Sequence, residues 1–205
     1  MITLIFFIDY KFSSRTLGTS ESLPPSIPLV LPNNVQYNEK TCKIVQSSPE
    51  QTSSKPGLNI VPSSINLIKS LGRKPLAVLS ICGPYRSGKS YFLSRFLGSK
   101  EIFKISNTDD PCTQGIWMST FVLECDEYAI LLLDTEGMES LEASEEYIVK
   151  LLVITTTISS TLIYNSMGIP ERSDLESLRY VQFEIMVGQS VIVQSIWTFR
   201  FCYVW

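Results

Sequence analysis

The chain has 205 residues, of which 44% are hydrophobic and 18% charged, and this composition is typical of one soluble globular domain with a sizeable core. Its net charge of −3 argues against a general nucleic-acid binder, and the absence of histidine excludes Ser-His-Asp and Cys-His catalysis and most metal sites built on imidazole. The five cysteines are odd in number and lack a C-x-x-C pair, so they indicate neither a disulfide framework nor a zinc knuckle. We therefore expect a reducing compartment and a cytoplasmic location.

Residues 1–58 are expected to form a disordered or extraneous leader and linker. Met1 to Ile8 are apolar but too few to span a bilayer, and no basic residue precedes them. They are interpreted as a stray strand or as sequence outside the folded domain, with a weak secretory signal as the alternative. Residues 12–57 are rich in Ser, Thr, Pro, Asn and Gln and contain one apolar cluster, Ile27 to Leu31. The folded domain is assigned to residues 59–205.

The clearest motif is a phosphate-binding loop at residues 83–90, Gly-Pro-Tyr-Arg-Ser-Gly-Lys-Ser. It fits the pattern G-x-x-x-x-G-K-[ST] at every fixed position and lies between an apolar strand at 76–82 and a helical segment at 91–97. Backbone N–H groups and the helix start form a cradle for a polyphosphate, and Gly83 and Gly88 allow close backbone approach. Lys89 is expected to reach the β- and γ-phosphates and Ser90 to bind Mg²⁺.

A second motif follows a pair of predicted strands at 116–124 and 128–133. Residues 129–133 form a continuous apolar run, as in a strand buried on both faces, and Asp134-Thr135-Glu136-Gly137 follows at its carboxyl end. Ligands of open α/β sheets collect at these carboxyl ends. An apolar strand that ends in Asp is the Walker-B arrangement, in which Asp134 steadies the magnesium shell and Gly137 lets a loop pivot near the γ-phosphate.

The remaining elements complete an α/β pattern. Residues 64–72 predict a short amphipathic helix, residues 147–161 fit a helix or a strand equally well, and residues 161–165 predict a core strand. Residues 173–187 have helical spacing, and residues 191–193 are β-like. The predicted fold class is an α/β P-loop NTPase with a mostly parallel central sheet, helices on both faces, and an incomplete C-terminus.

Four motifs in order resemble the large GTPase domain of the guanylate-binding proteins, which are dynamin-related. They are the phosphate loop, Thr113-x-Gly115-Ile116-Trp117, residues 133–137 and residues 163–168 (Ile-Tyr-Asn-Ser-Met-Gly). The resemblance covers about residues 60–187. It implies binding of GTP and GDP, hydrolysis of GTP with Mg²⁺ as cofactor, and a nucleotide-dependent homodimer. It gives no support for a nucleic-acid partner, and this chain lacks the family's long helical region, so membrane association is not expected.

The resemblance also implies residue roles. Arg86 corresponds to a catalytic arginine finger supplied in cis, Thr113 to the switch I threonine that completes the magnesium shell with Ser90, and Asp134 and Glu136 to the switch II pair, with Glu136 in the network that holds the attacking water. Catalysis is therefore assigned to Arg86, Lys89 and Glu136, and the metal to Ser90, Thr113 and Asp134. The nucleotide-binding set is Gly83, Tyr85, Arg86, Ser87, Gly88, Lys89, Ser90, Tyr91, Thr113, Gly137 and Arg200. The alternatives are a surface arginine for Arg86, a helix-start charge for Glu136 and a solvent-exposed strand end for Arg200.

Two departures from the family pattern leave a second function open. The family often has serine where this chain has Pro111, which offers no side-chain donor or acceptor. Residues 197–201 resemble the guanine-selecting segment, but no aspartate follows Arg200. A degenerate, non-catalytic nucleotide-binding or interaction module is therefore the alternative to a GTPase.

Overall fold

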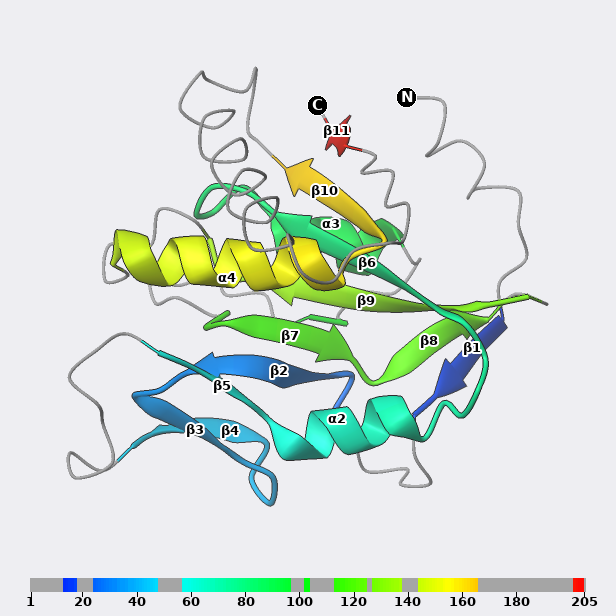
Figure 1. The fold of residues 1–205 in the computed structure, drawn as a ribbon, viewed down its shortest axis with the longest axis horizontal. Helices are drawn as coiled ribbons and strands as arrows, with labels where there is room; N and C mark the ends of the chain where they lie inside the picture. Colours follow the sequence, from blue (N-terminus) through cyan, green and yellow to red (C-terminus); the bar gives the residue numbers. More distant parts are fainter. Residues whose placement is uncertain are drawn as a thin grey trace, which may run out of the picture.

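The computed structural model describes residues 13–17, 24–47, 57–96, 102–103, 113–124, 127–137, 144–165 and 201–204. It is an α/β fold around one twisted sheet with the strand order β11-β10-β6-β9-β7-β2-β5, and β8 pairs with both β9 and β1 beside this path (Figure 1). A two-stranded sheet, β3 (Val35–Asn38) with β4 (Lys43–Gln46), lies next to β2.

The middle of the large sheet is parallel. β6 (Leu76–Cys82) lies between β9 (Ala129–Thr135) and β10 (Thr161–Asn165), and β11 (Phe201–Val204) pairs with β10. The register places Ile81 opposite Asp134 and Cys82 opposite Tyr164, so these three strands end at the same edge of the sheet. The phosphate loop, the Walker-B carboxylate and the end of β10 therefore meet at this edge.

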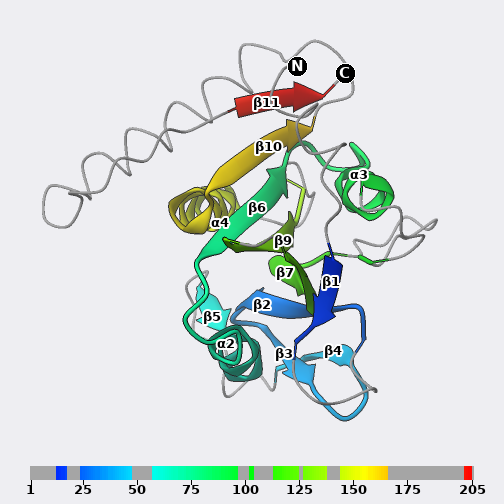
Figure 2. The same cartoon turned by 90° about the vertical axis from the view of Figure 1, so that its right-hand side faces the viewer.

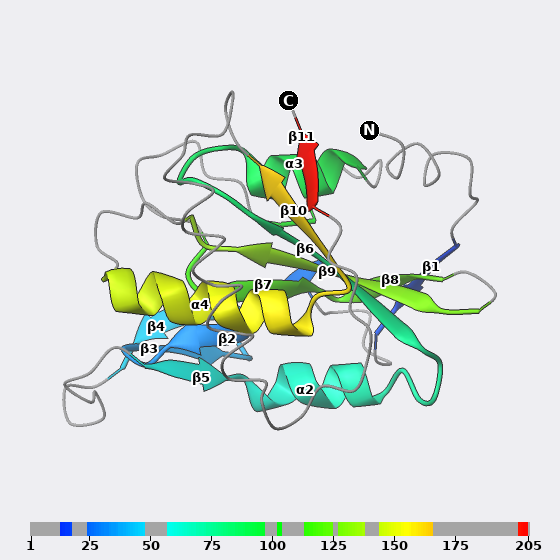
Figure 3. The same cartoon turned by 45° about the horizontal axis from the view of Figure 1, so that its top comes forward.

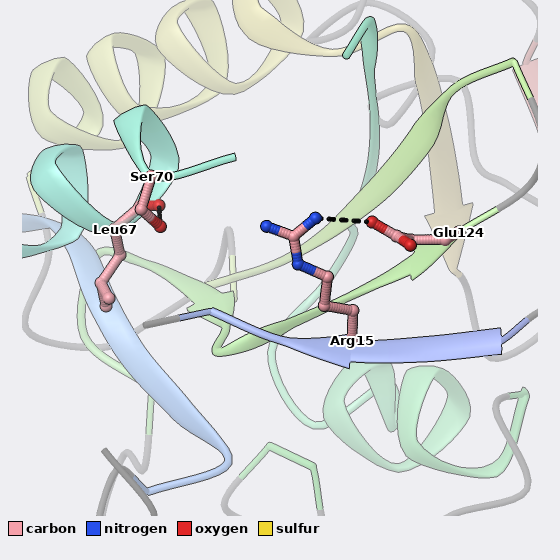
Figure 4. A network of polar contacts seen from close by, with 4 residues as sticks. All are labelled: Arg15, Leu67, Ser70 and Glu124. Carbon is pink, nitrogen blue, oxygen red and sulfur yellow. Dashed lines mark hydrogen bonds and ion pairs between the residues drawn. The ribbon is translucent and has the colours of Figure 1, made fainter. Parts of the chain in front are cut away.

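The other strands of the large sheet run antiparallel to their neighbours. They are β7 (Ile116–Ser119), β8 (Phe121–Glu124), β1 (Ser13–Thr16), β2 (Ser26–Pro32) and β5 (Leu58–Ile60). The single strand predicted at 116–124 is two strands, because Thr120 leaves the ladder and both its backbone N–H and its hydroxyl donate to carbonyls at Pro25 and Pro24. Arg15 on β1 forms an exposed ion pair with Glu124 on β8, at 3.2 Å (Figure 4).

The expectation that residues 12–57 lie outside the core is wrong for β2. Six of its seven residues are buried, and β2 pairs with β7 on one side and β5 on the other. The buried hydroxyl of Ser64 also donates to the carbonyl of Pro28, at 2.6 Å. Two prolines made this strand resemble a linker, but Pro28 sits at a register shift, where a missing N–H is tolerated.

Helices cover both faces of the sheet. α2 (Pro62–Lys69) and α4 (Glu145–Ile158) lie on one side, and α3 (Lys89–Phe96) lies on the other (Figures 2 and 3). Successive side chains of β9 point to opposite faces of the sheet, so this strand packs against the helices on both sides. Leu131 and Leu133 belong to the apolar cluster of α2 and α4, whereas Leu132 belongs to the cluster of α3. The α/β P-loop class is thus confirmed, with an antiparallel extension that the sequence did not predict.

The ambiguous segment after residue 147 is helical. α4 begins after Ser144, whose hydroxyl accepts a hydrogen bond from the N–H of Tyr147, and it ends at Ile158. The elements predicted at 1–8, 173–187 and 191–193 lie outside the described residues. Within the part of the chain that the structure describes, no helix has both the length and the apolar character needed to cross a bilayer.

Candidate functional site

The phosphate loop turns from the end of β6 into α3, and its backbone is packed against the end of β10. Gly83 has φ +146°, and a Cβ at this position would collide with the carbonyl oxygen of Asn165. The side-chain amide of Asn165 donates to the carbonyl of Ser87 at 2.6 Å and approaches the Ser87 hydroxyl at 3.3 Å. Asn165 of the neighbouring strand therefore contacts the loop at Gly83 and at Ser87.

Lys89 begins α3 and turns its ammonium group back toward the loop. Its Nζ donates to the carbonyls of Pro84, at 2.8 Å, and Gly83, at 3.3 Å, and the residue is only 7% exposed. Burial lowers the pKa of Lys89, and the nearby carboxylate of Asp134 opposes this effect. The loop thus holds a poorly hydrated cation at the position where a phosphate would be bound.

Asp134 lies near the carboxyl end of the buried strand β9, and hydroxyl groups from two other segments approach its carboxylate. Ser90 on α3 donates to Asp134 Oδ2 at 2.6 Å, and Thr113 approaches the same oxygen at 3.5 Å. Among the described residues, the other oxygen, Oδ1, has no hydrogen-bond partner although it is buried. Burial raises the pKa of Asp134 to about 6, despite the opposing effects of Ser90, Lys89 and Thr113.

These three side chains fit a magnesium ion. Mg²⁺ prefers oxygen ligands and is usually held by few protein groups together with substrate phosphates and water. Ser90, Thr113 and Asp134 supply two hydroxyls and a carboxylate. Oδ1 of Asp134, which has no partner within the described part of the chain, is a buried acceptor that a cation or its water shell would satisfy. No group of three or more Cys, Asp or Glu side chains suited to a metal occurs among the residues described.

Glu136 is buried two residues beyond Asp134, with 6% of its surface exposed. Its Oε2 accepts hydrogen bonds from the backbone N–H of Gly115, at 3.0 Å, and from the hydroxyl of Tyr147, at 2.7 Å. Its own N–H donates to the carbonyl of Gly115, at 2.9 Å. The predicted switch I and switch II segments are therefore joined through Gly115 and Glu136.

The other predicted residues differ in how close they lie to this centre. Arg86 is exposed with φ +61°, and its guanidinium lies 5.6 Å from the centre of the Tyr85 ring. Gly137 packs on the backbone of Tyr85, since an added Cβ would lie 2.5 Å from the Tyr85 Cα. Tyr91 is 54% exposed, with the guanidinium of Arg95 over its ring. Gly88 lies in the loop itself, whereas Arg200 and Pro111 lie outside the described residues.

Two residues of the site received no individual role from the sequence, namely Asn165 and Tyr147. Asn165 ends an apolar strand, and a polar residue at a strand's carboxyl end is a usable signal in α/β folds. Tyr147 gives no such signal, because it lies in an apolar helical stretch and meets Glu136 only through the packing of α4 on the sheet.

The succession of β6, loop and α3, with Asp134 facing Ser90 from the next strand, defines the fold class of the P-loop NTPases. The sequence model of the family described as "Guanylate-binding protein, N-terminal domain" matches residues 56–191, which is more than half of the chain. The chain belongs to the guanylate-binding protein family, as the resemblance of its motifs predicted.

Individual relatives agree with this assignment. Guanylate-binding protein 2 of Homo sapiens is 32% identical over 126 residues, which cover 60% of this chain and 21% of the relative. Guanylate-binding protein 2 of Rattus norvegicus is 36% identical over 121 residues, covering 56% of this chain and 20% of the relative. Guanylate-binding protein 4 of Homo sapiens is 32% identical over 143 residues, which cover 67% of this chain and 21% of the relative. The chain thus spans about a fifth of the length of these curated relatives.

A solved structure of Aquifex aeolicus Era bound to GDP.AlF4- aligns with 63% of this chain and 51% of that chain. The TM-score is 0.35 and the sequence identity is 14%.

Proposed function

We propose that this chain binds GTP and hydrolyses its terminal phosphoanhydride bond with Mg²⁺ as cofactor. The observation that carries the proposal is the juxtaposition of buried Lys89 with the cluster of Ser90, Thr113 and Asp134 at one edge of the sheet. A buried ammonium group beside a buried carboxylate is costly unless a ligand uses both charges, and a magnesium nucleoside triphosphate does so.

The phosphate half of the site would act mainly by positioning. Backbone N–H groups of residues 85–89 and the start of α3 favour anionic oxygens, and Lys89 would exchange its contacts with Gly83 and Pro84 for the β- and γ-phosphates. Asn165 keeps the loop in register for this contact through its bonds to Ser87.

Ser90, Thr113 and Asp134 would hold the metal. When bound, Mg²⁺ neutralises charge on the phosphate oxygens. Ser90 and Thr113 would redirect their hydroxyl oxygens from Asp134 toward the cation, and Asp134 would support its shell in the ionised form.

The hydrolytic step would use Glu136 and Arg86. The carboxylate of Glu136 lies at the junction of the two switch segments and would orient the attacking water. Arg86 would place its guanidinium on the developing charge of the phosphoryl group, which requires it to leave the Tyr85 ring. Its exposure leaves it accessible to a second subunit, and a nucleotide-dependent homodimer is part of the proposal.

Selection of the guanine base is assigned to the segment around Arg200. The missing aspartate after Arg200 predicts a weak preference for GTP over ATP, because a site that hydrogen-bonds its ligand discriminates through those partners. A competition experiment with the two nucleotides tests this assignment, and a strong preference would show that another group recognises guanine.

Phosphate release and binding of a fluorescent GTP analogue, measured in parallel on the purified chain, test the function. Lys89→Ala should weaken nucleotide binding about tenfold or more and abolish turnover, as expected for loss of a charge-assisted contact. Arg86→Ala should bind normally but turn over more slowly. Lys69→Ala and Arg73→Ala remove exposed charges elsewhere and serve as matched controls.

The outcomes separate the two candidate functions. A wild type that binds nucleotide but is as inactive as Lys89→Ala would refute hydrolysis and support the non-catalytic module that Pro111 suggests. A wild type whose affinity equals that of Lys89→Ala would refute nucleotide binding at this loop.

A further inference from the structure

The carboxylate of Glu136 is held by groups from two separate segments of the chain. One donor is the backbone N–H of Gly115, and the other is the hydroxyl of Tyr147, which makes the shorter bond at 2.7 Å. Both bonds end on Oε2, so the other carboxylate oxygen, Oε1, is the one that neither donor uses. Two donors on Oε2 hold this oxygen in place and leave Oε1 for another partner.

Tyr147 is itself held firmly. It lies in the first turn of α4, where its N–H donates to the Ser144 hydroxyl, and the residue is 7% exposed and belongs to the apolar cluster that includes Leu151 and Leu133. Burial raises the pKa of the Tyr147 hydroxyl, which stays protonated and therefore remains a donor. The position of α4 on the sheet thus sets the position of this donor.

We propose that Tyr147 is a positioning residue for hydrolysis, which aims the carboxylate of Glu136 so that Oε1 can hold the attacking water. This inference rests on the proposed GTPase function and deepens it. The backbone bond from Gly115 ties Glu136 to switch I, which would rearrange if the Thr113 hydroxyl turned from Asp134 to a bound metal. The bond from Tyr147 comes from a helix in the core, so it keeps the carboxylate aimed while switch I moves.

The competing explanation is that the hydroxyl only satisfies a buried carboxylate. Both explanations predict some loss of stability when the hydroxyl is removed, because a buried charge loses a hydrogen bond. They differ in which reaction step is affected. A positioning residue changes turnover at unchanged nucleotide affinity, and its effect disappears when the residue through which it acts is removed.

The experiment compares wild type, Tyr147→Phe, Glu136→Gln and the double variant in single-turnover GTP hydrolysis with Mg²⁺, and measures the affinity for a fluorescent GDP in the same samples. Tyr147→Phe keeps the ring in its apolar cluster and removes only the hydroxyl. We expect its hydrolysis rate to fall about tenfold or more, the size of one charge-assisted hydrogen bond, with affinity within about twofold of wild type. The double variant should be no slower than Glu136→Gln.

A matched control is Tyr37→Phe, which removes a tyrosine hydroxyl from β3, on the other sheet. It should hydrolyse GTP at the wild-type rate.

Three results would overturn the inference. The first is a hydrolysis rate of Tyr147→Phe equal to that of wild type, and the second is a fall of its rate and its affinity together. The third is a double variant that is slower than Glu136→Gln by the full effect of Tyr147→Phe. If wild type binds nucleotide without hydrolysing it, the proposed function fails and the inference fails with it. That case is recognised from wild type alone, before any variant is compared.

Discussion

Asp134 allows a quantitative test, in which the stability of the free protein should fall as pH rises and its affinity for the magnesium nucleotide should increase. The perturbation is Asp134→Asn, which removes the ionisable group and keeps a side chain of the same shape. In the folded protein without ligand, burial raises the pKa of Asp134 from 3.8 to about 6. Between these values the folded state holds a proton that the unfolded chain has released. The contribution of Asp134 to stability is therefore complete below the lower value and is lost as pH rises through the higher one.

The size of the effect follows from the pKa difference. At about 1.4 kcal/mol per pKa unit, wild type should lose about 2 to 3 kcal/mol of unfolding free energy relative to Asp134→Asn between about pH 4 and about pH 7.5. Titrating groups far from Asp134 are common to both proteins, so their effects cancel in the difference; Lys89 does not cancel, because the carboxylate of Asp134 raises its pKa. Changes in the contacts to Ser90 and Thr113 shift the two curves by a constant and do not alter their relative slope.

The assay is urea unfolding followed by tryptophan fluorescence, with a chelator present and nucleotide absent, at several pH values. A difference between the two proteins that does not change with pH would refute the assigned burial cost of Asp134. The affinity for a fluorescent nucleotide with Mg²⁺ should depend on pH in the opposite direction to the stability, because the metal requires the ionised carboxylate. Wild type should therefore bind more weakly below about pH 6, and Asp134→Asn should bind weakly at every pH.

Three further predictions concern the loop and the sheet. Asn165→Ala should weaken the binding of a fluorescent GDP about tenfold, because the loop loses its brace from β10, and unchanged affinity would contradict this role. Gly137→Ala should slow GTP hydrolysis about tenfold or more, since the new methyl group would lie 2.5 Å from the Cα of Tyr85 and displace switch II, whereas a wild-type rate would show that the contact yields freely. Ile27→Ala should lower the unfolding free energy by about 2 to 5 kcal/mol in urea. The exposed control Val45→Ala should change the unfolding free energy little. If both substitutions have equally small effects, β2 does not contribute to the core and residues 12–57 act as a leader, as the sequence predicted.

The phosphate loop and the Walker-B strand could be predicted because their chemistry is local. A cradle of backbone N–H groups needs glycine, lysine and a hydroxyl at fixed spacing, and a strand buried on both faces needs a continuous apolar run. Lys89, Ser90, Thr113 and Asp134 accordingly lie together as the motifs implied.

The remaining features depend on tertiary packing. β2 was missed because its prolines signal a linker, and only its pairing with β7 shows that the register shift accommodates Pro28. Tyr147 was missed because its role arises from a helix and a strand end that are brought together by an apolar cluster, which leaves no pattern in the spacing. The antiparallel extension of the sheet could not be predicted for the same reason, because the direction of a strand depends on how it is connected to its neighbours and not on its composition.

The position of β2 bears on which strand edges of the large sheet are covered. Its pairs with Ile116, Trp117 and Met118 cover the side of β7 that does not face β9, yet β2 lies wholly before residue 56, where the family match begins. A chain cut at that boundary would present an apolar edge with unpaired N–H and C=O groups, which is a template for strand exchange with another molecule and for aggregation. The segment that resembles a linker in the sequence thus covers the strand edge that β7 would otherwise expose.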